Sequence, residues 1–161
     1  MATSELTRRI EHPQDRAADD PMPRLEWLVT NGLGGYASGT VAGVVTRRYH
    51  GILVAALPAP LGRMVMLNHL LERARLKDGR VVWLGDEHEV AGVNAADRGG
   101  QLVEFRLDLG LPVWVYDFDG TRIEKRVLMP HGQNTTHVTY RLVSGDGPVR
   151  LPVRKGTGEF G

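Results

Sequence analysis

Two Asp-Gly pairs, each between short runs that contain apolar residues, constrain the fold of this chain more than any other feature. Asp78-Gly79 joins the run 70–76 to the run 80–84, and Asp119-Gly120 joins 112–118 to 121–129. Asp-Gly in this setting is a strong signal for a β-hairpin, because both residues tolerate the positive φ angles of a tight turn. Two hairpins of one kind predict a meandering antiparallel sheet.

Alternating side chains support this prediction around the second pair, where Val113 and Val115 alternate with Trp114 and Tyr116. Such alternation is typical of half-buried strands. The run 64–76 fits a helix or a strand, and the Asp-Gly pair after it favours the strand. Further strands are expected at 25–29, 44–57, 102–109, 135–143 and 149–153. Many short strands without a clear helical pattern predict an all-β fold, an antiparallel β-sandwich.

The length of 161 residues fits one domain. Residues 1–23 mix charges with prolines and show little apolar periodicity, so we expect a flexible N-terminal lead-in there. The β-sandwich domain is expected at 24–154. Glycines and sparse apolar content at 155–161 suggest a disordered or artificial C-terminal end.

Composition narrows the classes of function. The 20 Lys and Arg residues nearly balance the 19 Asp and Glu residues, so no basic field points to a nucleic acid or to a membrane surface. The absence of cysteine excludes disulfides and thiol catalysis, and is compatible with a reducing compartment. The charged N-terminus does not look like a secretory signal, and no apolar run is long enough to span a membrane. We therefore expect a cytoplasmic protein.

One motif could bind a dinucleotide and one pair of histidines could bind a metal ion, but the surrounding residues support neither function. The run 32–37, GLGGYA, has the G-x-G-x-x-A form of a dinucleotide-binding loop, but no helix pattern follows it and residues 50–57 contain no carboxylate. His131 and His137 lack a third metal ligand at a usable spacing. We expect no cofactor and no metal.

Four residues, Arg47, Arg48, Tyr49 and His50, interrupt an apolar segment that otherwise predicts one strand over 44–57. A local break of this kind tends to mark a functional or strained site. Successive residues of a strand point to opposite faces, so Arg48 and His50 would lie opposite Arg47 and Tyr49.

A resemblance to a known family lies in the stretch EWLVTNGLGGYASGTVAGVVTRRYHGILVAAL at 26–57, followed by PLGR at 60–63. It resembles the N-terminal domain of glycogen debranching enzymes of the bacterial and archaeal, amylo-α-1,6-glucosidase type, from about residue 25 to 153. The resemblance implies a β-sandwich of the supersandwich type that precedes an (α/α)6 toroid with the glycosidase site. The chain is expected to stop where that toroid begins, and the isolated chain is then expected to be inactive.

Glycoside hydrolysis needs two carboxyl groups that flank one bond. The candidates are Asp86, Glu87, Glu89, Glu104 and Asp108. The first three are expected in a solvated loop and the last two on an outer sheet face, and no pair has a context that would separate the two pKa values. No catalytic residue is assigned.

The resemblance leaves two interpretations of the central stretch. In the first, Asn31, Arg47, Arg48, Tyr49 and His50 are substrate-binding residues that meet an α-glucan such as glycogen in a groove shared with the catalytic domain. In the second, an arginine pairs with a buried acid to hold the glycine-rich loop, Tyr49 packs, and Asn31 caps a turn. The whole chain is then expected to be a non-catalytic domain of a debranching enzyme that packs on the (α/α)6 catalytic domain. The two alternatives are an autonomous polyglucan-binding module and a purely structural or oligomerisation domain, which could form a homo-oligomer.

Overall fold

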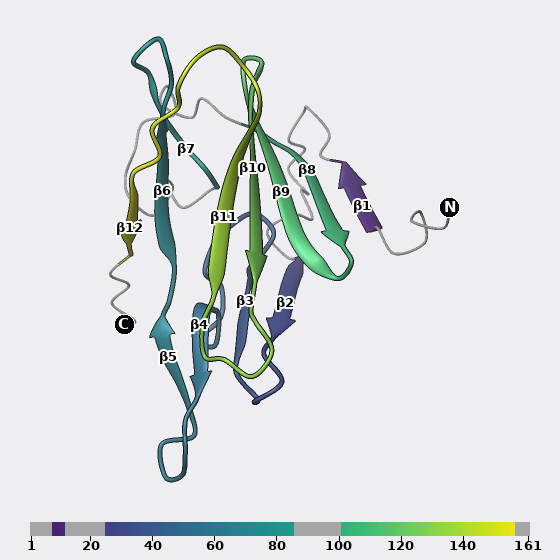
Figure 1. Cartoon of the computed structure of the whole chain (residues 1–161), viewed down its shortest axis with the longest axis vertical. Coiled ribbons are helices and arrows are strands. Elements are labelled where there is room, and N and C mark those ends of the chain that lie inside the picture. Colours follow the sequence, from purple (N-terminus) through teal and green to yellow (C-terminus); the bar gives the residue numbers. More distant parts are fainter. Residues whose placement is uncertain (1–7, 12–24, 86–100, 157–161) are drawn as a thin grey trace.

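The structure, a computed structural model, describes residues 8–11, 25–85 and 101–156, and none of these residues is helical (Figure 1). The all-β prediction is confirmed. The strands are β1 (Arg8–Glu11), β2 (Glu26–Thr30), β3 (Tyr36–Thr40), β4 (Gly51–Ala56), β5 (Arg63–Leu67), β6 (Leu70–Arg75), β7 (Val81–Trp83), β8 (Gln101–Asp108), β9 (Leu111–Phe118), β10 (Thr121–Leu128), β11 (His137–Ser144) and β12 (Val153–Lys155). The described residues form no helix that could cross a membrane.

The strands form three antiparallel sheets with the orders β1-β8-β9-β10-β11, β2-β3-β4-β5 and β12-β6-β7. In Figure 1 the five-stranded sheet lies in front of the four-stranded sheet, and the three-stranded sheet stands at one side. The sheet strands β8 to β11 follow one another along the chain, which is the meander that the second Asp-Gly pair predicts. The sandwich prediction is therefore confirmed as well.

The core lies between the sheets and is built around aromatic side chains. Trp27 of β2 meets Trp114 of β9 edge to face, with 5.2 Å between ring centroids and 85° between ring planes. Phe105 of β8 lies 5.3 Å from the same Trp114 ring. Edge-to-face contacts of this kind add to the stability from burial alone. This aromatic cluster joins the four-stranded sheet to the five-stranded sheet.

The central strand β9 is buried on both faces. Trp114 and Tyr116 point into the core, and the outward residues Val113 and Val115 are still only 0% and 8% exposed. Val113 pairs across the sheet with Arg106 and Arg126 on its two neighbouring strands. Long charged side chains cover apolar neighbours with their aliphatic stems while their charged ends stay in water. The sequence therefore suggests a charged outer face of the sheet, although the valines of β9 beneath the charged side chains are apolar and buried.

Both predicted Asp-Gly hairpins are present, with different turns. Asp119 and Gly120 have φ angles of 53° and 91° and form the two-residue loop between β9 and β10. Only Gly79 has a positive φ in the first hairpin, where Leu76 N donates to Arg80 O across a longer loop. A third tight turn at Leu109-Gly110, with φ angles of 52° and 82°, joins β8 to β9. Leucine carries no turn signal, so this hairpin was not predicted from its turn residues.

The prediction of one strand over residues 44–57 is wrong, because β4 begins only at Gly51. The chain leaves the sheet after β3, where Thr40 Oγ1 donates to Val44 O at 2.7 Å and Gly43 has a φ of 89°. This hydrogen bond and the positive φ angle form a turn after β3, and residues 41–46 lie in no strand. The glycine-rich segment before them contains a strand, β3, and β1 lies in a segment for which no strand was predicted.

Candidate functional site

Residues 47–50 form a turn, and its backbone is held from two directions. His50 N donates to Arg47 O at 3.0 Å and closes the turn. Tyr36 Oη and Ser38 Oγ, both on β3, donate to Tyr49 O at 3.1 Å and 3.4 Å. Fixing a surface turn in this way reduces the conformational entropy that a ligand would otherwise have to remove.

A carboxylate fixes the start and the end of the same turn. Glu26 Oε1 on β2 accepts a hydrogen bond from Arg47 Nε and lies 3.4 Å from His50 Nε2. His50 Nδ1 in turn accepts a hydrogen bond from Thr46 N at 3.4 Å. Burial lowers the pKa of His50, and the nearby Glu26 carboxylate opposes that shift. A neutral imidazole fits this geometry, with its proton on Nε2 toward Glu26.

The side chains of Arg48 and Tyr49 point away from these contacts. Tyr49 is 68% exposed, although its carbonyl oxygen is doubly hydrogen-bonded. Arg48 is exposed and makes no hydrogen bond or ion pair with any residue that the structure describes. The turn therefore presents a guanidinium and a phenol ring to the surroundings on a fixed backbone.

The candidate residues thus fall into separate groups. Arg48 and Tyr49 are on the surface, whereas His50 is buried, with 4% exposure, and Arg47 is engaged with Glu26. The predicted division into two strand faces does not apply, because these residues lie in a turn. In the second interpretation the arginine–acid pair is present, as Arg47 with Glu26, but the acid is 39% exposed and not buried, and Tyr49 is 68% exposed and does not pack. Substrate binding by this stretch stays a prediction.

Asn31 lies at the start of the glycine-rich turn and is fully buried, with 0% exposure. Its Oδ1 accepts hydrogen bonds from Leu33 N and Gly35 N, both at 3.0 Å. Its Nδ2 donates to Gln133 O at 2.9 Å and to Asn134 Oδ1 at 3.0 Å. Asn31 therefore connects the turn 31–35 to the loop between β10 and β11.

The close approach of these loops explains two of the glycines. A Cβ on Gly35 would lie 2.6 Å from Asn31 Nδ2, and a Cβ on Gly32 would lie 2.3 Å from His131 Cε1. The run 32–37 ends in β3 and does not open a helix, so the condition for a dinucleotide loop is not met. Among the residues that the structure describes, no group of acids and histidines could hold a metal ion.

The candidate carboxylates on strands are engaged in ion pairs. Glu104 Oε1 lies 2.8 Å from Arg106 Nη1, and Asp108 Oδ2 lies 2.8 Å from Arg126 Nη2. Asp86, Glu87 and Glu89 lie outside the described residues. The arrangement of Glu104 and Asp108 is that of a charged outer sheet surface.

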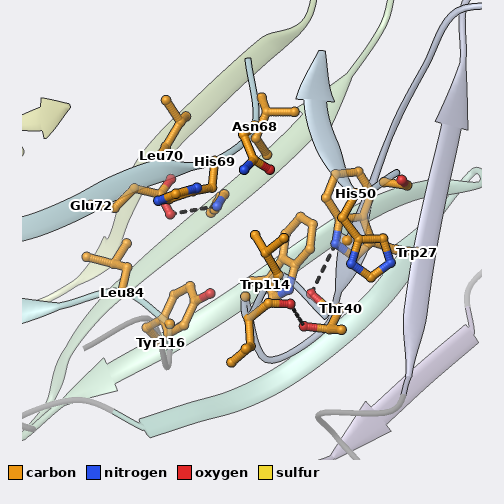
Figure 2. Close-up of a pocket in the computed structure, with 18 residues that line it drawn as sticks. Trp27, Thr40, His50, Asn68, His69, Leu70, Glu72, Leu84, Trp114 and Tyr116 are labelled. Atoms are coloured by element: carbon orange, nitrogen blue, oxygen red, sulfur yellow. Dashed lines mark hydrogen bonds and ion pairs between the residues drawn. The ribbon is translucent and has the colours of Figure 1, made fainter. Parts of the chain in front are cut away.

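Sequence reasoning missed a polar cluster around Glu72, whose side chain is labelled in Figure 2. Lys125 Nζ of β10 lies 2.6 Å from Glu72 Oε2 of β6, and Tyr140 of β11 donates to Glu72 Oε1. A cavity of about 40 Å³ adjoins this cluster. The signal available in sequence was a lysine in the register of Ile123 and Val127, which are both core residues.

The comparison with family models decides the family. The model for the N-terminal domain of glycogen debranching enzyme matches residues 25–156, which is most of the chain. The chain belongs to this family. Within the glycogen debranching enzyme N-terminal domain, the match covers every described strand except β1. No curated protein and no solved structure matched the chain.

Proposed function

We propose that this glycogen debranching enzyme N-terminal domain is non-catalytic, that it packs on an (α/α)6 catalytic domain, and that its Arg47–His50 turn helps to form the α-glucan groove. The observation that carries the proposal is the presentation of Arg48 and Tyr49. Arg48 offers a set of hydrogen-bond donors without a competing partner in the described part of the chain. Tyr49 offers an aromatic surface with a polar end.

A second observation supports packing on another domain. Most of the exposed large apolar side chains lie in the segment that forms the four-stranded sheet, namely Leu28, Leu33, Tyr49, Leu61, Met64, Val65 and Met66. The edge strand β5 is exposed along most of its length. Exposed apolar surface on an edge strand favours contact with another protein surface. We take the catalytic domain as that surface, with Tyr49 at the border where substrate would pass.

The test uses a polypeptide that joins this domain to its catalytic domain. Tyr49→Ala and Arg48→Ala are each expected to reduce kcat/KM on branched glucan about tenfold, which corresponds to the loss of about 1.4 kcal/mol. Leu109→Ala is the matched control, because Leu109 is 70% exposed on a different turn. Unfolding midpoints are measured for all variants. Unchanged kcat/KM in both turn variants, or an equal loss of kcat/KM in Leu109→Ala, would contradict the proposed role of the turn in the α-glucan groove.

Two alternatives remain to be separated from this function. An autonomous polyglucan-binding module would bind branched malto-oligosaccharide as the isolated chain, at millimolar or lower concentration, and would lose that binding in Tyr49→Ala. A purely structural or oligomerisation domain would show a concentration-dependent mass or a loss of stability in Arg48→Ala, without a kinetic effect. Titration of the isolated chain by calorimetry, followed by the kinetic comparison, distinguishes the three.

A further inference from the structure

A small cavity, partly open at the surface, lies next to the segment that leads into the Arg47–His50 turn. Its volume is about 40 Å³, and its polar lining includes Thr40, His50, Asn68, His69, Glu72 and Lys125. In Figure 2, Asn68 and His69 lie on one side of this space, with Trp114 and Thr40 opposite. The lining therefore combines charged, amide and imidazole groups with apolar side chains such as Trp27 and Ile52.

Two polar atoms of this lining have no partner. Asn68 Oδ1 and His69 Nδ1 are both buried, and neither makes a hydrogen bond with any described residue. An unsatisfied buried polar group costs about 1–3 kcal/mol, and such groups are rare in native proteins. Two on consecutive residues, beside the same cavity, require a common explanation.

We propose that the cavity holds an ordered water molecule that bridges Asn68 Oδ1 and His69 Nδ1. A cavity needs roughly 10–15 Å³ to hold a water molecule, so this space is large enough for water. A water molecule also needs two to four polar partners. Asn68 Oδ1 accepts a water proton, His69 Nδ1 supplies a second contact, and the Lys125 ammonium has donors beyond the one used by Glu72.

The position of the His69 ring is set from its other side by Gly156. The amide of Gly156 donates to His69 O at 3.0 Å, and a Cβ on Gly156 would lie 1.8 Å from His69 Nε2. A side chain at position 156 therefore requires the imidazole to move. The His69 imidazole therefore adjoins both the proposed water site and Gly156, the last residue that the family model matches. The proposal does not depend on glucan binding, so each can fail without the other.

The direct test is a crystal structure of the 161-residue chain at about 1.5 Å resolution, grown without polyols. We expect electron density for water within hydrogen-bond distance of both Asn68 Oδ1 and His69 Nδ1. An empty cavity at that resolution overturns the proposal. In Gly156→Ala we expect the imidazole and the water to be displaced together, and a displaced imidazole with undisturbed density beside Asn68 contradicts the shared contact.

The sign of a stability change provides a second test. If the cavity is dry, Asn68→Leu removes an unsatisfied acceptor and raises the urea midpoint of unfolding. If water fills it, the same change leaves the water and His69 without a partner, and the midpoint falls. Gln133→Leu makes a similar polar-to-apolar change at an exposed side chain and serves as the control. A urea midpoint of Asn68→Leu above that of Gln133→Leu overturns the proposal. If Asn68→Leu does not fold, the crystal structure of the unchanged chain is the deciding test.

Discussion

Lys125 Nζ lies 2.6 Å from Glu72 Oε2 inside the sandwich and so connects the five-stranded sheet to the three-stranded sheet. The two side chains are only 11% and 4% exposed. The ammonium also lies 5.3 Å from the centroid of the Trp114 ring. Burial and the Glu72 charge raise the pKa of Tyr140, so its hydroxyl stays protonated and donates to the carboxylate. Each charge in this cluster is compensated.

Removal of the Lys125 ammonium is therefore expected to destabilise the folded protein. Lys125→Met leaves the Glu72 carboxylate buried without a counter-charge, and we expect the free energy of unfolding to fall by about 3–5 kcal/mol. The double variant Lys125→Met/Glu72→Gln should recover part of that loss, because it removes the unpaired charge. Urea denaturation of the three proteins measures both effects. A loss below about 1 kcal/mol in the single variant would show that the pair behaves like an exposed one.

Asn31 should behave as a structural residue whatever the turn binds. Asn31→Ala removes four hydrogen bonds at a fully buried site, and we expect a loss of about 3 kcal/mol. Asn31→Asp keeps the acceptor for Leu33 N and Gly35 N and loses only the amide donor, so its loss should be smaller at neutral pH if the new charge is tolerated. Chemical denaturation compares the two variants, and equal stability of Asn31→Ala and the unchanged protein would contradict the assigned role.

Stability should fall as the pH drops below about 6.5, the usual histidine pKa. Burial lowers the pKa of both His50 and His69 in the folded protein. The unfolded state therefore binds protons at a higher pH than the folded state, and acidification favours unfolding. The stabilising contribution is complete above the unfolded pKa and is lost as the pH falls toward the lowered folded values.

Urea midpoints between pH 7.5 and pH 5 measure this dependence. Each of His50→Gln and His69→Gln should flatten the curve, because a glutamine does not titrate. His137→Gln is the control, because it makes the same substitution at an exposed histidine. A curve that keeps its slope when both His50 and His69 are replaced would assign the effect to other groups.

The sequence allowed the hairpins to be predicted because their chemistry is local. Asp119-Gly120 adopts two positive φ angles that this dipeptide tolerates, and no distant contact is needed to place the turn. Leu109-Gly110 makes the same kind of turn without such a signal. The flanking strands β8 and β9 hold it in register, so pairing overrides the unfavourable residue.

The turn at residues 47–50 could not be predicted in the same way. Its apolar neighbours favour a strand, and the contacts that oppose the strand come from elsewhere in the chain. Tyr36 and Ser38 hold Tyr49 O, and Glu26 holds Arg47. The break in the sequence pattern singled out residues 47–50, and the structure shows that they leave the strand and form a turn. The sequence did not show which side chains face outward, because that depends on these distant partners.

Glu26 offers the sharpest test of how the turn is held. Glu26→Gln keeps the size of the side chain and removes the charge that Arg47 and His50 share. The Arg47–Glu26 pair is 69% and 39% exposed, so we expect stability to change by less than about 1 kcal/mol. The amides of Arg48 and Tyr49 should nevertheless become more mobile on the nanosecond timescale, which ¹⁵N relaxation measures. Asp78→Asn is the matched control, because it removes a similarly exposed partner of Arg80 at a different turn. If relaxation at Tyr49 is the same in both variants, Tyr36 and Ser38 alone fix the turn, and Glu26 is not a positioning residue.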